Sequence, residues 1–182
     1  MKAIRFVGLF VLGSGLVTLT GCMTPPLQPL RDDGTYCHSS GKSYRPALTC
    51  SPQAAPSSEV ETNAKRFDAD PGALTIYVIR RRWADPNGVV PIAVDGQVRA
   101  STTPASWVRL RLAPGSHRLS SEWKGRSADI AVDGKAGEIR YVKLDIASWL
   151  WGTEMALKAA VAEDAQPHAR ASRLVADVDF RR

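Results

Sequence analysis

The sequence predicts an all-β protein, an antiparallel β-sandwich of immunoglobulin-like size. Short runs beyond residue 71 alternate apolar and polar side chains with a period of two, as half-buried strands do. Tight-turn signals separate these runs at intervals of about eight to twelve residues, which is typical of a sandwich. A third observation, a Pro- and Ser-rich stretch before residue 71, places the sandwich after a disordered N-terminal tether.

The composition is that of an ordinary globular domain. The 182 residues are 44% hydrophobic and 23% charged, which excludes a wholly disordered, collagen-like or multi-span membrane protein. Lys and Arg number 24 against 18 Asp and Glu, and removing Lys2 and Arg5 with the leader described next leaves 22 against 18. This excess favours an anionic surface but lacks the dense clustering of nucleic-acid binders, so no nucleic-acid partner is expected.

The first residues have the pattern of an export signal. Basic residues Lys2 and Arg5 precede an uncharged apolar run over residues 6–19, which is shorter than the roughly 20 residues that a membrane-spanning helix needs. Residues 1–21 are therefore expected to be cleaved. Leu19-Thr20-Gly21-Cys22 resembles a bacterial lipobox, which implies that the Cys22 thiol is acylated as a thiolate nucleophile. The alternative is an incidental cysteine after an ordinary signal.

Lipidation of Cys22 would define where the protein resides. Each buried methylene contributes about 0.8 kcal/mol, so two or three acyl chains would hold the chain at a membrane. Residue 23 is Met rather than Asp, and resemblance to lipoproteins of double-membrane bacteria then implies transfer to the outer membrane. We expect a cell-envelope protein whose domain faces the periplasm.

The two other cysteines are predicted to form a disulfide. An oxidising compartment would pair Cys37 with Cys50, and a loop of this size should contribute about 3 kcal/mol to stability. Two alternatives are weaker: Cys37 with His38 as a hydrolase nucleophile and base, or both cysteines with His38 as zinc ligands. We expect neither a metal nor a cofactor.

The tether is assigned to residues 22–70 and the sandwich to residues 71–182. Six of the twelve prolines lie within residues 23–58, a density that favours an extended, semi-rigid segment. Pro71-Gly72 marks the boundary. This tether would lift the domain clear of the lipid headgroups.

The strands of the sandwich follow in chain order. They are expected at residues 74–81, 90–94, 97–99, 107–112, 117–123, 128–132, 139–146, 155–161 and 174–180. Asp95-Gly96 predicts a tight hairpin, and Ala113-Pro114-Gly115, Lys124-Gly125 and Asp133-Gly134 mark further turns. Residues 162–171 are a possible short helix, interrupted at Pro167.

The fourth run shows the clearest alternation. In residues 107–112, Val108, Leu110 and Leu112 are expected to face the core, and Trp107, Arg109 and Arg111 to face solvent. The central runs together resemble an uncharacterised family of bacterial lipoproteins, catalogued as a domain of unknown function. The resemblance lies in Ile76-Tyr77-Val78-Ile79-Arg80, Val94-Asp95-Gly96, Ala113-Pro114-Gly115-Ser116-His117 and Gly137-Glu138-Ile139-Arg140-Tyr141-Val142. It implies a PEGA-like sandwich and brings no catalytic residues.

Arginines give a candidate binding surface. Arg80 and Arg82 near Trp83, with Arg109 and Arg111, could bind an anionic envelope polymer or lipid headgroup through bidentate pairing. The alternative is a solvated face whose Arg stems cover apolar surface.

Two other features leave a structural and a functional interpretation open. For Trp149-Leu150-Trp151, we expect a place in the core rather than contact with a membrane or partner. For His117, we expect a backbone hydrogen bond that fixes its turn rather than a catalytic role. The sequence as a whole therefore favours a lipid-anchored envelope lipoprotein with a non-enzymatic binding or scaffolding domain, whose partner is an envelope protein or an anionic glycan.

Overall fold

A computed structural model describes residues 27–81, 87–150 and 152–181, apart from the side chain of Trp149. Its strands are β1 (Thr35–Lys42), β2 (Arg45–Ala54), β3 (Leu74–Arg80), β4 (Val90–Val94), β5 (Gln97–Thr102), β6 (Ser106–Leu112), β7 (Gly115–Trp123), β8 (Arg126–Gly134), β9 (Ile139–Trp149), β10 (Gly152–Ala160) and β11 (Arg173–Asp179). The helices are α1 (Ser58–Ala64) and α2 (Ala162–Arg170).

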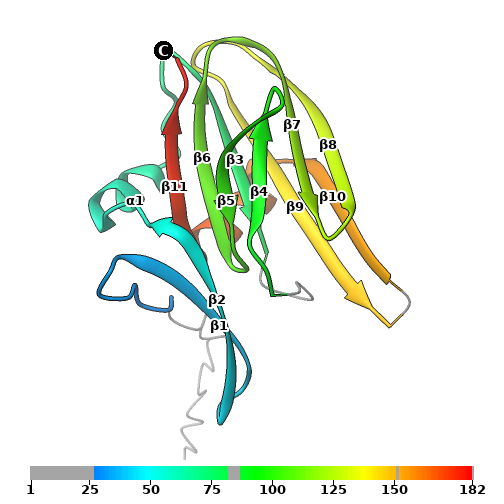
Figure 1. The fold of residues 1–182 in the computed structure, drawn as a ribbon. Helices are drawn as coiled ribbons and strands as arrows, with labels where there is room; N and C mark the ends of the chain where they lie inside the picture. The colour runs from blue at the N-terminus through cyan, green and yellow to red at the C-terminus, as the bar shows by residue number, and fades with distance from the viewer. Residues whose placement is uncertain (1–26, 82–86, 151, 182) are drawn as a thin grey trace, which may run out of the picture.

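Two sheets form a β-sandwich, which confirms the predicted fold class (Figure 1). One sheet has the order β10-β9-β3-β6-β11 and the other has the order β5-β4-β7-β8. Alternate residues of both sheets meet between them in the larger hydrophobic cluster, which includes Ile76, Val108, Leu110, Leu119 and Leu144. The inward face predicted for β6 is therefore confirmed.

The centre of the five-stranded sheet is buried on both faces. All seven residues of β3 are buried, as expected for a central strand covered on both sides. The outer face carries a second cluster with Tyr77, Trp107 and Tyr141, against which Ala165 and Ala169 of α2 pack. Trp107 is fully buried there, so its predicted exposure is wrong, because the helices cover the face that alternation alone assigns to solvent.

Two strand pairings in the five-stranded sheet are parallel. β3 pairs with β9 and β6 pairs with β11 in this direction, whereas the sequence predicts antiparallel pairing throughout. Parallel neighbours need a crossover connection. The crossover from β3 to β9 includes the whole four-stranded sheet, and the crossover from β6 to β11 ends with α2.

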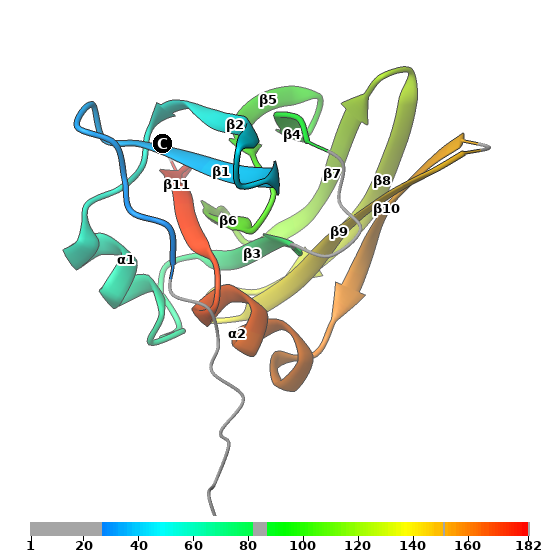
Figure 2. The same cartoon turned by 90° about the horizontal axis from the view of Figure 1, so that it is seen from below.

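Residues 27–70 are folded onto the sandwich, and this corrects the predicted extended tether. β1 and β2 form a hairpin beside β5 and β11 (Figure 2), and Tyr36 from β1 is 1% exposed within the main core. Helix α1 begins after Ser57, whose side-chain oxygen accepts a hydrogen bond from the backbone N–H of Val60. The hairpin buries apolar surface that a Pro and Ser count does not reveal.

The turn signals agree with the backbone. Asp95 and Gly96 have φ values of 50° and 79°, and Lys124 and Gly125 have 48° and 72°, as two-residue hairpin turns require. Pro167 lies inside α2 and does not interrupt it, which corrects the expectation at this position. Ala165 and Ala169, on either side of the proline, are fully buried, and this packing offsets the backbone hydrogen bond that proline removes.

Candidate functional site

Of the four arginines predicted to form one anionic-ligand surface, the three that the structure describes do not come together. Arg80 is fully buried and donates from Nη1 to the carbonyl oxygens of Gly88 (2.8 Å) and Thr102 (3.1 Å). Arg82 lies outside the described residues. Arg109 and Arg111 lie on the outer face of β6. The three described side chains therefore do not present a shared surface.

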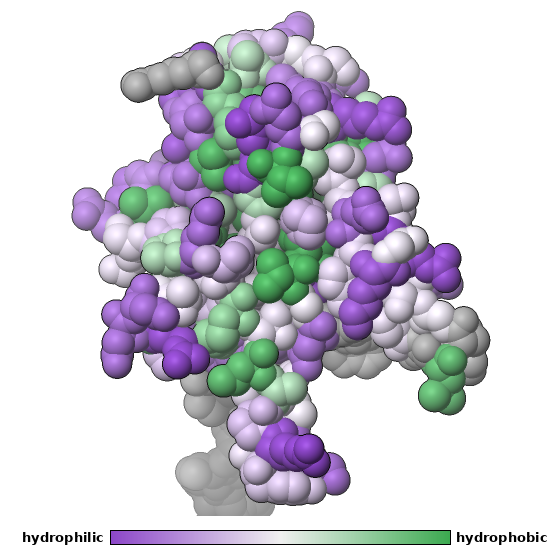
Figure 3. Space-filling model, in the orientation of Figure 1, coloured by the Kyte–Doolittle hydropathy of each residue, from purple (hydrophilic) through white to green (hydrophobic). Residues whose placement is uncertain are grey.

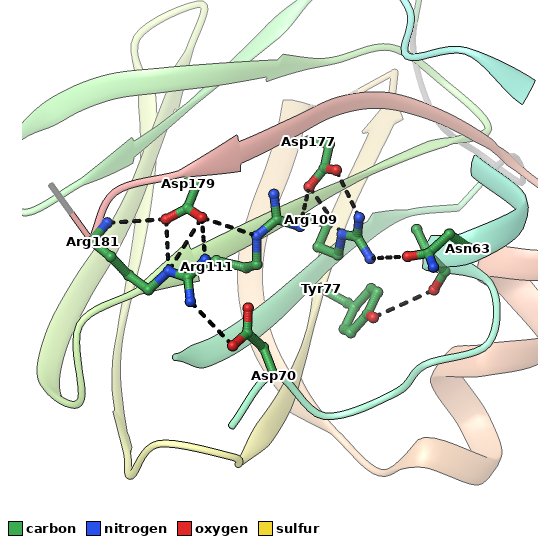
Figure 4. Close-up of polar contacts among 9 residues, drawn as sticks. Asn63, Asp70, Tyr77, Arg109, Arg111, Asp177, Asp179 and Arg181 are labelled. Atoms are coloured by element: carbon green, nitrogen blue, oxygen red, sulfur yellow. Dashed lines mark hydrogen bonds and ion pairs between the residues drawn. The ribbon is translucent and has the colours of Figure 1, made fainter. Parts of the chain in front are cut away.

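Arg109 and Arg111 belong to an ion-pair ladder across β6 and β11 (Figure 4). The parallel register places Arg109 opposite Asp177 and Arg111 opposite Asp179. Arg109 donates Nε and Nη2 to the two Asp177 oxygens at 2.9 and 2.7 Å, a bidentate geometry. Arg111 Nη1 lies 2.8 Å from Asp177 Oδ1.

The ladder continues beyond β11. Arg181 pairs with Asp179 and also reaches Asp70 at 3.1 Å, in the segment before β3. Three arginines, Arg109, Arg111 and Arg181, thus meet three carboxylates, Asp70, Asp177 and Asp179. With balanced charge, the ladder stabilises strand pairing rather than offering free guanidinium groups to an anion.

The electrostatics of the ladder agree with this role. The Arg181 side chain hydrogen-bonds to Asp179 and holds the pKa of that carboxyl far below its ordinary value. Burial alone would lower the pKa of Arg109, but the hydrogen bonds and charge of Asp177 raise it above the usual value. Burial raises the pKa of Tyr77, whose hydroxyl donates to the Ala64 carbonyl oxygen at 3.4 Å.

The acidic half of the ladder was missed in the sequence. Asp177-Val178-Asp179 repeats carboxylates with a period of two, matching the period of Arg109 and Arg111. Two strands with complementary charges at this spacing are a signal for pairing, but the signal is informative only when the two strands are known to be neighbours.

The predicted Cys37–Cys50 disulfide is present, and it joins directly opposed residues of β1 and β2. Its sulfur atoms are bonded to each other, so Cys37 is not the free thiol that a Cys/His hydrolase would need, and the zinc interpretation fails for the same reason. No group of three or more potential metal ligands occurs within the described ranges. Cys22, the predicted lipidation site, lies outside them, as do Trp83 and Trp151.

His117 occupies the turn position that the sequence indicates. Its Nε2 lies 2.8 Å from the Ala113 carbonyl oxygen and its Nδ1 lies 2.8 Å from Asp95 Oδ2. The expected backbone hydrogen bond is confirmed, and a second contact ties the turn to the β4–β5 hairpin. This arrangement fixes two loops.

A lateral seam between β8 and β10 carries two grooves. Each of these strands has one hydrogen-bonded neighbour in the described sheets, and they run alongside each other as edges of different sheets. Two grooves of about 530 and 450 Å³ lie along the seam. The first has Arg126, Asp145, Glu154 and Lys158 in its lining, and the second is mostly apolar.

The opposite side of the sandwich is closed. The β1–β2 hairpin lies against β5 and β11 there (Figure 2), and a groove of about 120 Å³ lies along this contact. The seam thus combines strand edges that lack a second neighbour with two accessible grooves, one charged and one mostly apolar. These are the properties of a surface that can bind an extended segment.

In the part of the chain that the structure describes, no helix has the length and apolarity to cross a bilayer. Neither a scan of protein-family models nor a search of curated proteins found a match to this chain. The lipoprotein family named above therefore stays a prediction.

Proposed function

We propose that this chain is a lipid-anchored cell-envelope lipoprotein, held at the outer membrane through Cys22 with its folded domain in the periplasm. One observation carries the proposal: the disulfide between Cys37 and Cys50. Such bonds persist in oxidising compartments such as the periplasm. This disulfide follows an N-terminal segment that has the features of an export signal and a lipobox.

The sandwich serves as a non-enzymatic binding module, and its partner adds an extended segment at the β8–β10 seam. Unpaired strand edges supply backbone hydrogen-bonding groups, and the groove beside them supplies apolar contact. An envelope protein with an exposed extended segment is the partner class that these groups would recognise.

Intact-mass analysis of the full chain, expressed in a double-membrane bacterium, tests the anchor. We expect a product that begins at Cys22 and carries acyl chains, whereas Cys22→Ala yields an unacylated product. An unmodified wild-type product that still begins with Met1 would overturn the anchor.

Site-specific photocrosslinking in the envelope tests the binding module. A photoreactive residue at Ala159, in the seam, should capture a protein partner, and the same residue at exposed Ala54 on β2 is the matched control. Equal capture at both positions would contradict the seam as a binding site. Turnover of a substrate by the purified protein, with no partner captured, would contradict the non-enzymatic role.

A further inference from the structure

One end of the sandwich gathers exposed cations and apolar loop tips. β3 and β9 finish at this end, and β6, β10 and β11 begin there. The β7–β8 turn lies at the same end, because Arg126, which follows the turn, is close to Gly152 at the start of β10. Asn87 donates a hydrogen bond to Ser40 of β1, which brings the β1–β2 turn to the same end. We name this region the anchor end; it is the lower end of Figure 1, opposite the C-terminus.

The tips at the anchor end expose large apolar side chains. Leu150, between β9 and β10, is fully exposed, so the core position expected for it is wrong. Tyr44, between β1 and β2, is 78% exposed. Figure 3 shows hydrophobic atoms on the β9–β10 tip, which projects at the lower right beyond the body of the domain. A tyrosine, with an apolar ring and a polar hydroxyl, suits the boundary between lipid and water.

Cations surround these tips. Lys42 and Arg45 flank Tyr44, Lys124 lies in the β7–β8 turn and Arg126 begins β8. All four are exposed. The carboxylates of Glu122 and Glu154 lie on the adjoining strands β7 and β10, so the group keeps a positive balance. The far end is mixed in charge, with Asp95 paired to His117 and Glu138 paired to Arg140.

The chain leading to the domain is too short to hold this end away from a bilayer. Gln28 is fixed by hydrogen bonds: its side chain bonds the backbone of Ser39, and its carbonyl oxygen accepts from Arg173. Arg173 is the first residue of β11 and therefore lies at the anchor end. Only six residue steps separate Cys22 from Gln28, and an extended chain covers at most about 22 Å in six steps.

We propose that the anchor end lies on an anionic lipid surface. Leu150 and Tyr44 enter the interfacial region, and Lys42, Arg45, Lys124 and Arg126 contact the headgroup phosphates. This inference rests on the proposed acylation of Cys22, because the short connection to Gln28 supplies the proximity.

A depth-dependent fluorescence experiment tests the orientation. The full acylated chain is reconstituted in phosphatidylethanolamine vesicles containing phosphatidylglycerol, with an environment-sensitive dye on Leu150→Cys. The matched control carries the dye on Val98→Cys, which is 66% exposed near the far end. Quenchers attached to the lipids should reduce emission several-fold more at 150 than at 98.

Charge reversal tests the role of the cations. Lys42→Glu with Lys124→Glu should weaken the quenching at 150, as should high salt, because exposed charges are screened. Equal quenching at 150 and 98 in a preparation whose mass shows acylated Cys22 would overturn the orientation and leave the anchor intact. Protection of 150 by a protein in cells, without quenching in vesicles, would overturn it in favour of a protein partner.

A preparation without the acyl group separates the two proposals. If the mass shows that Cys22 is unmodified, the anchor proposal fails by itself. Salt-sensitive quenching at position 150 on added anionic vesicles would then still support the proposal that the anchor end binds anionic lipid. The absence of quenching would overturn that proposal.

Discussion

His117 has an oxygen acceptor at each of its ring nitrogens. Asp95 Oδ2 and the Ala113 carbonyl oxygen both lie at 2.8 Å, from Nδ1 and Nε2 respectively. A neutral imidazole can donate from only one nitrogen, so both contacts are hydrogen bonds only when the ring is protonated. Burial lowers the pKa of His117, but hydrogen bonds to Asp95 and Ala113 outweigh it and raise the pKa above 6.5.

We therefore expect His117 to stabilise the fold more in its protonated form. Because the folded-state pKa is raised, the contribution is complete below the unfolded-state pKa and is lost as pH rises through the folded-state value. His117→Gln should cost a few tenths to about 1 kcal/mol of unfolding free energy near pH 5, since the pair is partly exposed, and less near pH 9.

Urea unfolding of both proteins across this pH range, with an NMR titration of His117, measures the effect. Asp95→Asn is the control, because it removes the charge at a position where Asn tolerates the positive φ; the pKa of His117 should fall in this variant. A wild-type pKa at or below the ordinary histidine value would rule out the interpretation.

Residue-level predictions succeeded where the chemistry is local. His117 is four residues from Ala113, and Asp95-Gly96 and Lys124-Gly125 carry their turns in two adjacent residues. The predictions for Trp107, Arg109 and Arg111 failed to foresee their partners because those lie in α2 or β11, far along the chain. Alternation shows which residues share a face of a strand, but not which face another layer will cover.

At the scale of elements, the ladder between β6 and β11 should contribute to stability. The Arg109 and Asp177 side chains are 12% and 11% exposed, so removing one partner leaves a poorly solvated charge. Arg109→Met should cost about 2 kcal/mol, less than the loss of an isolated buried pair, because Arg111 still contacts Asp177. A double-mutant cycle with Asp177→Asn should give a coupling energy of about 1–3 kcal/mol.

The exposed pair of Arg118 and Asp129 is the matched control for this cycle. It also joins an arginine to an aspartate on neighbouring strands, at 2.8 Å, but its side chains are 70% and 52% exposed. Its coupling energy should stay below about 1 kcal/mol. Equal coupling in the two pairs would mean that burial and strand register do not strengthen the ladder.

The β1–β2 hairpin should be coupled to the stability of the whole sandwich. Replacing Cys37 and Cys50 with Ala is expected to cost about 3 kcal/mol, because the unfolded chain regains the freedom of the closed loop. Because Tyr36 of the hairpin packs in the core, loss of the hairpin should also destabilise the two sheets. Denaturant curves followed by tryptophan fluorescence and by far-UV circular dichroism should therefore shift together, in one transition.

Tyr36→Ala provides a second route to the same conclusion. It keeps the disulfide and removes the core contact, at a cost of about 3 kcal/mol, as for other large aromatic deletions. A hairpin that behaved as a separate tether would leave the main unfolding transition unchanged in both variants.

At the scale of the whole molecule, the sequence predicts the sandwich but not its N-terminal limit. Each strand from β3 to β8 carries its own alternation and turn residues, so the all-β class follows from local pattern. The hairpin and α1 are short and polar, and few of their side chains enter the core. Their folding depends on tertiary contacts made by Tyr36 and Glu61, which composition does not reveal.

A chain that begins at residue 71 should consequently fail to fold stably. It would lack Tyr36, and also Phe67, whose ring centroid lies 5.1 Å from that of Tyr77 and 6.1 Å from that of Tyr141. It would also lack Glu61, which is buried and pairs with Arg173 at 2.7 Å, so Arg173 would lose its carboxylate partner.

The comparison is with a chain beginning at residue 27, which retains all three groups. We expect this longer chain to unfold cooperatively, and the shorter chain to bind a hydrophobic dye and elute as an aggregate or expanded species, because the outer aromatic cluster becomes accessible. Circular dichroism, dye binding and size-exclusion chromatography at matched concentration measure the difference. Equal stability of the two chains would restore residue 71 as the domain boundary, because residues 27–70 would then contribute nothing to the core.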